Sequence, residues 1–156
     1  MSRVQLALRV SDLESSIAFY SSLFGVEPAK RRPGYANFAV TEPPLKLVLI
    51  EGEPDRPTVL DHLGVEVQTT GEVDAAPRRL AERGLFTQVE NDTTCCYALQ
   101  DKVWVHGPGA EPWEVYTVKA DAPDATSIHP LGQPDTGECA CGTPSTPEEE
   151  QLRACC

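Results

Sequence analysis

The chain has 156 residues, and its 13 Lys and Arg against 24 Asp and Glu give a formal net charge of −11. This length suits one domain with a substantial core. The negative charge argues against nucleic acid and anionic membrane surfaces as partners, because phosphates would be repelled. No apolar stretch approaches the roughly 20 residues that span a bilayer. The first residues run into a strand-like pattern without a signal-peptide region, so we expect a cytoplasmic protein.

The first predicted element is a strand over residues 4–10, in which apolar and polar side chains alternate. A helix-like stretch follows from about residue 13 to 24. Ser11 or Asp12 suits its N-cap, and Gly25 suits its C-terminal stop. Three short strand candidates complete the unit, at about residues 28–32, 35–40 and 45–50.

The same order of elements recurs in the second half of the chain. A strand over 61–67 precedes a helix over about 72–83 that stops at Gly84, and three strand candidates follow at about 86–90, 97–105 and 112–118. The unit is therefore βαβββ, repeated in modules of about residues 1–52 and 59–119. We predict an α+β fold in which the two modules form one domain over 1–119, shaped as a cup with polar walls.

The remaining segment, residues 120–156, has a different composition. It holds five prolines, four cysteines, seven acidic residues and a single arginine, with few large apolar side chains. Such a segment buries too little surface to offset the entropy lost on ordering. We expect an acidic, Pro- and Cys-rich flexible tail.

Three residues of the predicted strands could form a metal site. Gln5 and His62 occupy matching positions in the two repeats, and Glu114 lies in the last strand. An amide oxygen, an imidazole and a carboxylate would leave positions open for oxygen and substrate, as in non-haem Fe(II) enzymes. Taken singly, each residue is more often structural or solvated than a ligand. The position that matches Glu114 in the first repeat is about Leu47, so the duplication predicts one site.

Cys95 and Cys96 are adjacent, with Cα atoms about 3.8 Å apart, whereas a relaxed disulfide prefers roughly 4.4–6.8 Å. Two reduced thiols at this spacing suit the joint binding of one thiophilic atom; the alternative is a chance pair of small apolar residues. Successive side chains of a regular strand point to opposite faces. A shared ligand therefore requires a loop or a bulge, and the polar run 91–94 favours a loop.

The other cysteines are also paired in sequence, and all lie in the tail: Cys139, Cys141, Cys155 and Cys156. They suit the capture of a soft cation or metalloid, or they are thiols without a role. Arg9 and Glu66, on the cup-facing sides of equivalent strands, could pair with each other or position a polar substrate. The residues alone leave both questions open.

The repeated βαβββ unit with His62 and Glu114 resembles the vicinal oxygen chelate superfamily, which includes glyoxalases and extradiol dioxygenases. Within it, the stretch Thr94-Cys95-Cys96-Tyr97-Ala98-Leu99-Gln100-Asp101-Lys102 closely resembles the organoarsenical carbon–arsenic lyases, which are related to cadmium-induced proteins. The resemblance covers about residues 2–118. It implies the vicinal oxygen chelate fold, an incompletely closed mixed β-barrel.

The resemblance also implies a function. The family cleaves the carbon–arsenic bond of trivalent organoarsenicals, such as methylarsenite and trivalent aromatic arsenicals, with Fe(II) and with O2 as co-substrate, and so detoxifies arsenic by releasing arsenite. Cys95 and Cys96 would bind arsenic, and Gln5, His62 and Glu114 would hold the iron. Many members carry His where this chain has Gln5, so we expect weaker iron binding and a site that Ni, Co or Zn can also occupy. We expect a monomer or a homodimer.

Two other functions compete with this one. A non-catalytic cadmium- or arsenite-binding protein would need the cysteines but not the metal site or oxygen. A glyoxalase- or thiol-transferase-like enzyme would leave the adjacent cysteines without a role. Oxygen dependence separates the first alternative from a lyase.

Overall fold

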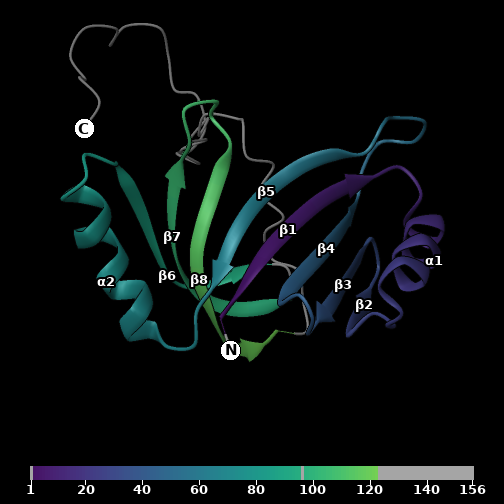
Figure 1. Cartoon of the computed structure of the whole chain (residues 1–156), viewed down its shortest axis with the longest axis horizontal. Coiled ribbons are helices and arrows are strands. Elements are labelled where there is room, and N and C mark those ends of the chain that lie inside the picture. Colours follow the sequence, from purple (N-terminus) through teal and green to yellow (C-terminus); the bar gives the residue numbers. More distant parts are fainter. Residues whose placement is uncertain (1, 96, 123–156) are drawn as a thin grey trace, which may run out of the picture.

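Eight strands form one curled sheet in the computed structural model, which describes residues 2–95 and 97–122. The strand order is β2-β3-β4-β1-β5-β8-β7-β6, so β2 and β6 lie at the two ends of an incompletely closed barrel. The two helices lie at opposite ends of the curled sheet (Figure 1). The α+β fold class predicted from the sequence is confirmed.

Each half of the chain supplies one βαβββ module. The first consists of β1 (Arg3–Val10), α1 (Leu13–Phe24), β2 (Lys30–Arg32), β3 (Tyr35–Val40) and β4 (Leu45–Glu51). The second consists of β5 (Val59–Glu66), α2 (Thr70–Ala81), β6 (Thr87–Cys95), β7 (Ala98–His106) and β8 (Pro112–Asp121).

The two modules join through their first strands. β1 pairs antiparallel with β5, while β1 is parallel to β4 and β5 is parallel to β8. The last strand of each module therefore lies beside its first strand. This arrangement brings β4, β1, β5 and β8 together at the floor of the cup.

The alternation in β1 separates the core from the cup. Leu6, Leu8 and Val10 pack with Ile17 of α1 in the main apolar core. The side chain of Asp12 accepts a hydrogen bond from the backbone of Ser15 and so caps α1. The opposite face of β1 is left for the cup, as the alternation predicts.

The second helix begins earlier than its periodicity indicates. Thr69 and Glu72 form a capping box, in which each side chain accepts a hydrogen bond from the other residue's backbone, so α2 starts at Thr70 rather than near residue 72. Val73 and Ala76 are its buried residues.

The predicted loop over residues 91–94 is wrong, because β6 continues through it to Cys95. The ladder with β7 shifts register between Glu90 and Thr93, and Asp92 has a φ of 52°. Pairing with β7 overrides the turn propensity of this polar run, and the extra residue forms a bulge. The segment therefore takes the other conformation that the sequence allowed. Cys96 lies outside the described residues.

Within residues 2–95 and 97–122, no helix is long and apolar enough to cross a membrane. The predicted tail lies outside the described residues from residue 123 onward, and so do Cys139, Cys141, Cys155 and Cys156. The division near residue 119 and the tail thiols' role stay predictions.

Candidate functional site

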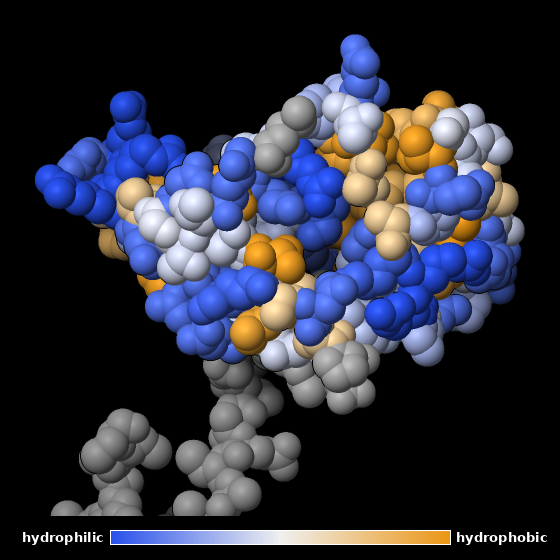
Figure 2. All heavy atoms as spheres, turned by 90° about the horizontal axis from the view of Figure 1, so that it is seen from below, coloured by the Kyte–Doolittle hydropathy of each residue, from blue (hydrophilic) through white to orange (hydrophobic). Residues whose placement is uncertain are grey.

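The inner side of the sheet encloses a cavity of about 560 Å³, to which both modules contribute. Seen from below, the molecular surface is hollowed near its centre, and both hydrophilic and hydrophobic residues border the hollow (Figure 2). The wall from the first module includes Tyr35, Val48 and Ile50, whereas the second module supplies mostly polar and charged side chains.

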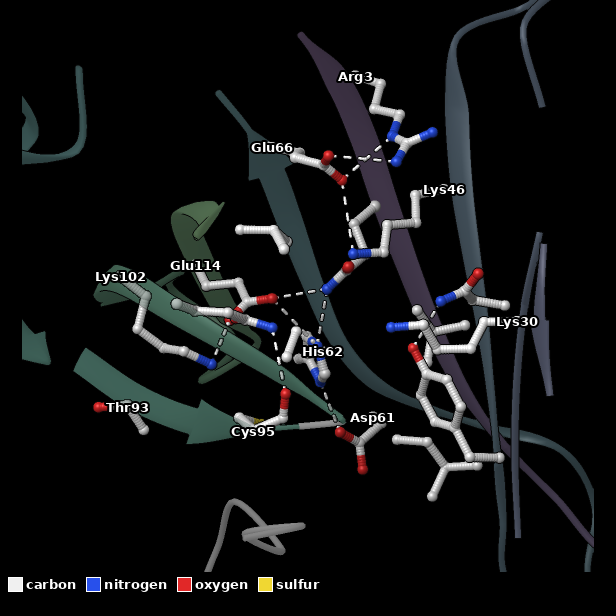
Figure 3. Close-up of a pocket in the computed structure, with 18 of the residues that line it drawn as sticks. Arg3, Lys30, Lys46, Asp61, His62, Glu66, Thr93, Cys95, Lys102 and Glu114 are labelled. Carbon is white, nitrogen blue, oxygen red and sulfur yellow. Dashed lines mark hydrogen bonds and ion pairs between the residues drawn. The ribbon is translucent and has the colours of Figure 1, made fainter. Parts of the chain in front are cut away.

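The three residues proposed as metal ligands converge in this cavity. Gln5 Nε2 lies 3.0 Å from His62 Nε2 and donates a hydrogen bond of 2.6 Å to Glu114 Oε1, while His62 Nε2 lies 3.5 Å from the same carboxylate oxygen. All three side chains are buried. Figure 3 shows His62 and Glu114 directed toward the same point from different strands.

A glycine makes this convergence possible. Gly64 of β5 pairs with Gln5 of β1 on one side and with Glu114 of β8 on the other. A Cβ atom at Gly64 would lie 3.2 Å from Gln5 Cβ and 3.1 Å from Glu114 Cγ. The missing side chain therefore lets the two flanking side chains approach each other.

The register corrects one detail of the repeat. Ala7 pairs with Val48 in the first module where Gly64 pairs with Glu114 in the second, so Val48 rather than Leu47 occupies the position that matches Glu114. Val48 lines the cavity, and Leu47 belongs to the core behind the sheet. Both are apolar, so the first module has no carboxylate at this position.

A buried lysine, which the sequence reasoning did not single out, fixes the charge of Glu114. Lys102 Nζ donates to Glu114 Oε2 at 3.1 Å, and both side chains are almost inaccessible to solvent. Burial raises the pKa of Glu114, but its hydrogen bond with His62 and the charge of Lys102 outweigh burial and lower that pKa to about 2. Glu114 is therefore a carboxylate at neutral pH. Alternation along β7 could have indicated Lys102 from the sequence, because Lys102 lies two residues from Gln100 and both line the cavity.

Asp61 orients the imidazole. His62 Nδ1 lies 2.6 Å from Asp61 Oδ1, so Nε2 faces Gln5 and Glu114. Burial lowers the pKa of His62, but the hydrogen bonds with Asp61 and Glu114 outweigh burial and raise it to about 9. A carboxylate partner at the second ring nitrogen is the usual support of a metal-binding histidine.

Arg9 does not pair with Glu66, one of the two possibilities that the sequence left open. Arg9 pairs with Asp61. Glu66 instead pairs with Arg3 and Lys46 (Figure 3). Arg9 therefore supports the residue that orients the imidazole, and Glu66 belongs to a separate charged cluster on the cavity wall.

A divalent metal at this point would need three donor atoms from the buried side chains. Among the described residues, no group of three His, Cys, Asp and Glu side chains could hold a metal ion, so a metal beside His62 and Glu114 would need the Gln5 amide as its third donor. A half-turn of the Gln5 amide brings its oxygen beside His62 Nε2 and Glu114 Oε1. A cation that replaces the Nε2 proton of His62 would then face three donor atoms, the amide oxygen, the carboxylate oxygen and the imidazole nitrogen.

The neighbouring hydroxyl favours the same half-turn. Tyr116 Oη lies 2.6 Å from Gln5 Oε1 and 2.9 Å from Glu66 Oε2, yet one hydroxyl proton serves only one acceptor. After the half-turn, the hydroxyl accepts from the Gln5 amide and donates to Glu66, so both contacts are satisfied. The residues present therefore fit a divalent metal.

Cys95, at the end of β6, lines the same cavity together with Thr93. Its backbone carbonyl accepts a hydrogen bond of 3.3 Å from Gln100 Nε2. The structure thus brings one of the two adjacent cysteines to the cavity that holds Gln5, His62 and Glu114.

Residues 3–115 match the family described as the Glyoxalase/Bleomycin resistance protein/Dioxygenase superfamily. The chain belongs to this superfamily. Its two βαβββ modules form one open sheet, which is the fold that the resemblance implied.

Several individual proteins are similar to this chain in sequence. A trivalent organoarsenical cleaving enzyme of Thermomonospora curvata is 72% identical over 122 residues, which cover 78% of this chain and 81% of that protein. A cadmium-induced protein of Mycobacterium tuberculosis is 64% identical, covering 78% and 80%. A further trivalent organoarsenical cleaving enzyme, from a Bacillus species, is 37% identical and covers all of this chain and 99% of its own.

A solved structure of the superfamily fold agrees. An extradiol ring-cleaving dioxygenase from B. fuscum superposes with a TM-score of 0.55 at 23% identity, over 77% of this chain and 33% of the dioxygenase. The likeness at this identity concerns the fold alone.

Proposed function

We propose that this protein is an Fe(II)- and O2-dependent enzyme that cleaves the carbon–arsenic bond of trivalent organoarsenicals and releases inorganic arsenite. One observation carries the proposal: Cys95 lines the same cavity in which Gln5, His62 and Glu114 converge. The relatives named as trivalent organoarsenical cleaving enzymes, at 72% and 37% identity, support the same reaction. Methylarsenite and trivalent aromatic arsenicals are the expected substrates, and arsenic detoxification is the expected role.

Substrate binding begins at the thiols. Trivalent arsenic is soft and prefers thiolate ligands. Cys95 would displace one hydroxyl from arsenic, and Cys96, adjacent in sequence, the second. The organic group would then be held inside the cavity close to His62 and Glu114. Holding two reactants in such a geometry supplies a large share of an enzyme's rate.

Three residues would hold the iron: Gln5 through its amide oxygen, His62 through Nε2 and Glu114 through Oε1. When bound, Fe(II) supplies the redox chemistry by which O2 attacks the carbon bonded to arsenic. Asp61 keeps the Nε2 of His62 directed inward, and Lys102 keeps Glu114 ionised. Ni, Co or Zn would fit the same donors without supporting oxygen chemistry.

The apolar part of the wall has its own task. Trp104 packs edge-on against the His62 ring, with centroids 5.7 Å apart, and Val48 and Ile50 line the first module's side. With substrate bound, these side chains would help to exclude water from the site, which would strengthen the electrostatic interactions inside it. The reduced thiols that the reaction needs are consistent with the expected cytoplasmic location.

The decisive experiment measures the products. The full-length protein is loaded anaerobically with Fe(II), given trivalent methylarsenical, and analysed for arsenic species with and without O2. We expect arsenite only when iron and O2 are both present. Cys95→Ser should abolish the release, whereas the matched substitution Cys139→Ser in the tail should leave it intact. Arsenite released without O2, or full activity of Cys95→Ser, would contradict the proposal.

A second candidate is a non-catalytic cadmium- or arsenite-binding protein, favoured by the 64% identity to a cadmium-induced protein. Binding would then be tight, would not turn over, and would not depend on Gln5, His62 or Glu114. In this reading, Cys139, Cys141, Cys155 and Cys156 would add to the capture of the metal or metalloid. Iron-loaded, reduced protein that binds arsenical without conversion would favour this candidate.

A further inference from the structure

The cavity-facing positions of β6 switch from even-numbered to odd-numbered residues along the strand. Gln88 and Glu90 line the cavity near its start, and Thr93 and Cys95 line it near its end. Strict alternation from Glu90 would instead direct residues 92 and 94 inward and Cys95 outward. A one-residue shift in this strand is therefore what turns Cys95 toward the cavity.

The bulge supplies that residue. Glu90 pairs with Lys102 and Thr93 pairs with Gln100, so β6 advances by three residues where β7 advances by two. Both partners on β7 line the cavity. The ladder after the bulge therefore resumes with Thr93 and Cys95 on the inner face.

A buried aspartate holds the bulge from the outer face of the sheet. The backbone N–H of Asp92, whose φ is 52°, donates to Asp101 Oδ1 at 2.9 Å. The hydroxyl of Thr70, the first residue of α2, donates to Asp101 Oδ2 at 2.8 Å. Lys119 Nζ lies 2.6 Å from Asp92 Oδ1 and 3.2 Å from Asp101 Oδ1.

Asp101 does not line the cavity and therefore takes no direct part in the chemistry. Its exposed fraction is 2%, and it is absent from the cavity lining, although its neighbours Gln100 and Lys102 line the cavity. The hydrogen bond from the Asp92 backbone is the main cause that lowers the pKa of Asp101, so the carboxyl group is ionised at neutral pH. A buried charge is costly unless its partners compensate it, and here those partners are the bulge, α2 and Lys119.

We propose that Asp101 is a positioning residue for Cys95, because it holds the β6 bulge that turns the thiol into the cavity. The inference rests on the proposed function, in which Cys95 binds arsenic. Regular pairing continued from Glu90 would place Asp92 opposite Gln100 and Thr94 opposite Ala98. Cys95 would then fall in the turn. Asp101 favours the bulged register over this alternative by accepting the N–H that the bulge removes from the ladder.

The test uses the metal-free, reduced, full-length protein and phenylarsine oxide as the arsenical probe. The dissociation constant is measured together with the alkylation rate of Cys95, read by peptide mass spectrometry. Asp101→Ala should weaken binding at least tenfold and accelerate alkylation of Cys95. Its Co(II) affinity should stay within threefold of wild type, since Gln5, His62 and Glu114 are untouched. Asp74→Ala, an exposed aspartate of α2, is the control and should change neither quantity.

A deletion variant separates positioning from general damage. Removing Asp92 removes the extra residue but keeps Cys95 paired with Ala98 and facing inward. In that background Asp101→Ala should change arsenical binding less than twofold, because no bulge remains to be held. If the deletion variant does not fold, Asp101→Asn decides, since its side-chain oxygen still accepts the Asp92 N–H. Alkylation of Cys95 should then stay near the wild-type rate in Asp101→Asn and rise in Asp101→Ala.

The outcomes distinguish this inference from the function on which it rests. Wild-type protein that fails to bind phenylarsine oxide would overturn the arsenic-binding role of Cys95, while the alkylation rates would still test Asp101. Normal binding and alkylation in Asp101→Ala would overturn the positioning role alone. Equal losses of arsenical and Co(II) binding would also overturn it, because they indicate that the fold is damaged.

Discussion

The side chain of Gln5 and the hydroxyl of Tyr116 lie 2.6 Å apart, and this contact joins the candidate metal site to a buried charged cluster. The same hydroxyl lies 2.9 Å from Glu66 Oε2 and accepts a hydrogen bond of 3.1 Å from Lys46 Nζ. Burial, together with the charge of Glu66, raises the pKa of Tyr116, so the phenol keeps its proton. The orientation of the Gln5 amide therefore depends on a residue that touches no metal.

Tyr116→Phe should weaken metal binding. With the Gln5 oxygen directed at the metal, its NH2 group needs the Tyr116 hydroxyl as acceptor, and the phenylalanine offers none. Loss of such a supporting contact typically lowers metal affinity about 10–100-fold. Anaerobic competition of Fe(II) or Co(II) against a chromophoric chelator measures the change. Tyr35→Phe, which removes a hydroxyl elsewhere on the cavity wall, is the matched control, and an equal loss there would argue against this coupling.

Gln5→His should bind Fe(II) more tightly than wild type. A neutral imidazole is a better donor to Fe(II) than an amide oxygen, and the substitution completes a two-histidine, one-carboxylate set. Gln5→Ala should bind more weakly, whereas Gln88→Ala, on another part of the wall, should have no effect. The same chelator competition reports all three. Unchanged affinity in Gln5→His would indicate that Gln5 is not a ligand.

Lys102→Met should destabilise the metal-free protein by up to roughly 3–5 kcal/mol, because the buried charge of Glu114 would lose Lys102 and keep only His62 and Gln5 as partners. A bound divalent cation supplies positive charge to the same carboxylate, so metal should recover part of the loss. Urea unfolding with and without Co(II) tests both statements. Lys30→Met is the control, since its partner Asp121 is 73% exposed and such pairs contribute about 1 kcal/mol or less.

Glu66→Gln should remove a pH-dependent part of the stability. Burial raises the pKa of Glu66, but the charge of Lys46 and the hydrogen bonds from Arg3 and Tyr116 outweigh it and lower that pKa below 4.5. A lowered folded-state pKa stabilises the protein above the unfolded-state value, and this stabilisation disappears as the pH falls through the folded-state value.

The free energy of unfolding should therefore differ between wild type and Glu66→Gln by about 1–3 kcal/mol near pH 7. The difference should shrink as the pH falls from neutral through the lowered folded-state pKa of Glu66, because its carboxyl group then becomes neutral like the amide. Urea unfolding across this range provides the measurement. The exposed residue Glu53 gives the control variant Glu53→Gln, which should show a small and nearly constant difference. A pH-independent loss in Glu66→Gln would mean that its charge does not contribute.

Local sequence patterns predicted most of the fold. Alternation over residues 4–10 and 61–67, with a helix after each, predicted the two modules because side-chain direction in a strand is set by the backbone alone. The repeat also grouped Gln5 with His62, since equivalent strands meet at the centre of the sheet. The start of α1 at Leu13 agrees with the prediction, whereas the start of α2 does not, because the capping box at Thr69 is a contact between side chains and backbone rather than a periodicity.

Pairing between strands decided what the local patterns could not. The polar run before Cys95 favoured a loop, yet the ladder with β7 absorbed it as a bulge. Local sequence patterns indicated no role for Lys102 or Asp101. Their roles follow from contacts with other elements: Lys102 with Glu114 of β8, and Asp101 with α2 and β6.

The sequence by itself determined the duplicated modules, the three candidate ligands and the adjacent cysteines, because each of these depends on residue identity and short-range alternation. Only the tertiary structure decided that Cys95 faces the cavity and that Tyr116 contacts Gln5 across 111 positions of the chain. Register and buried charge pairing are set jointly by distant strands, so no local pattern contains them.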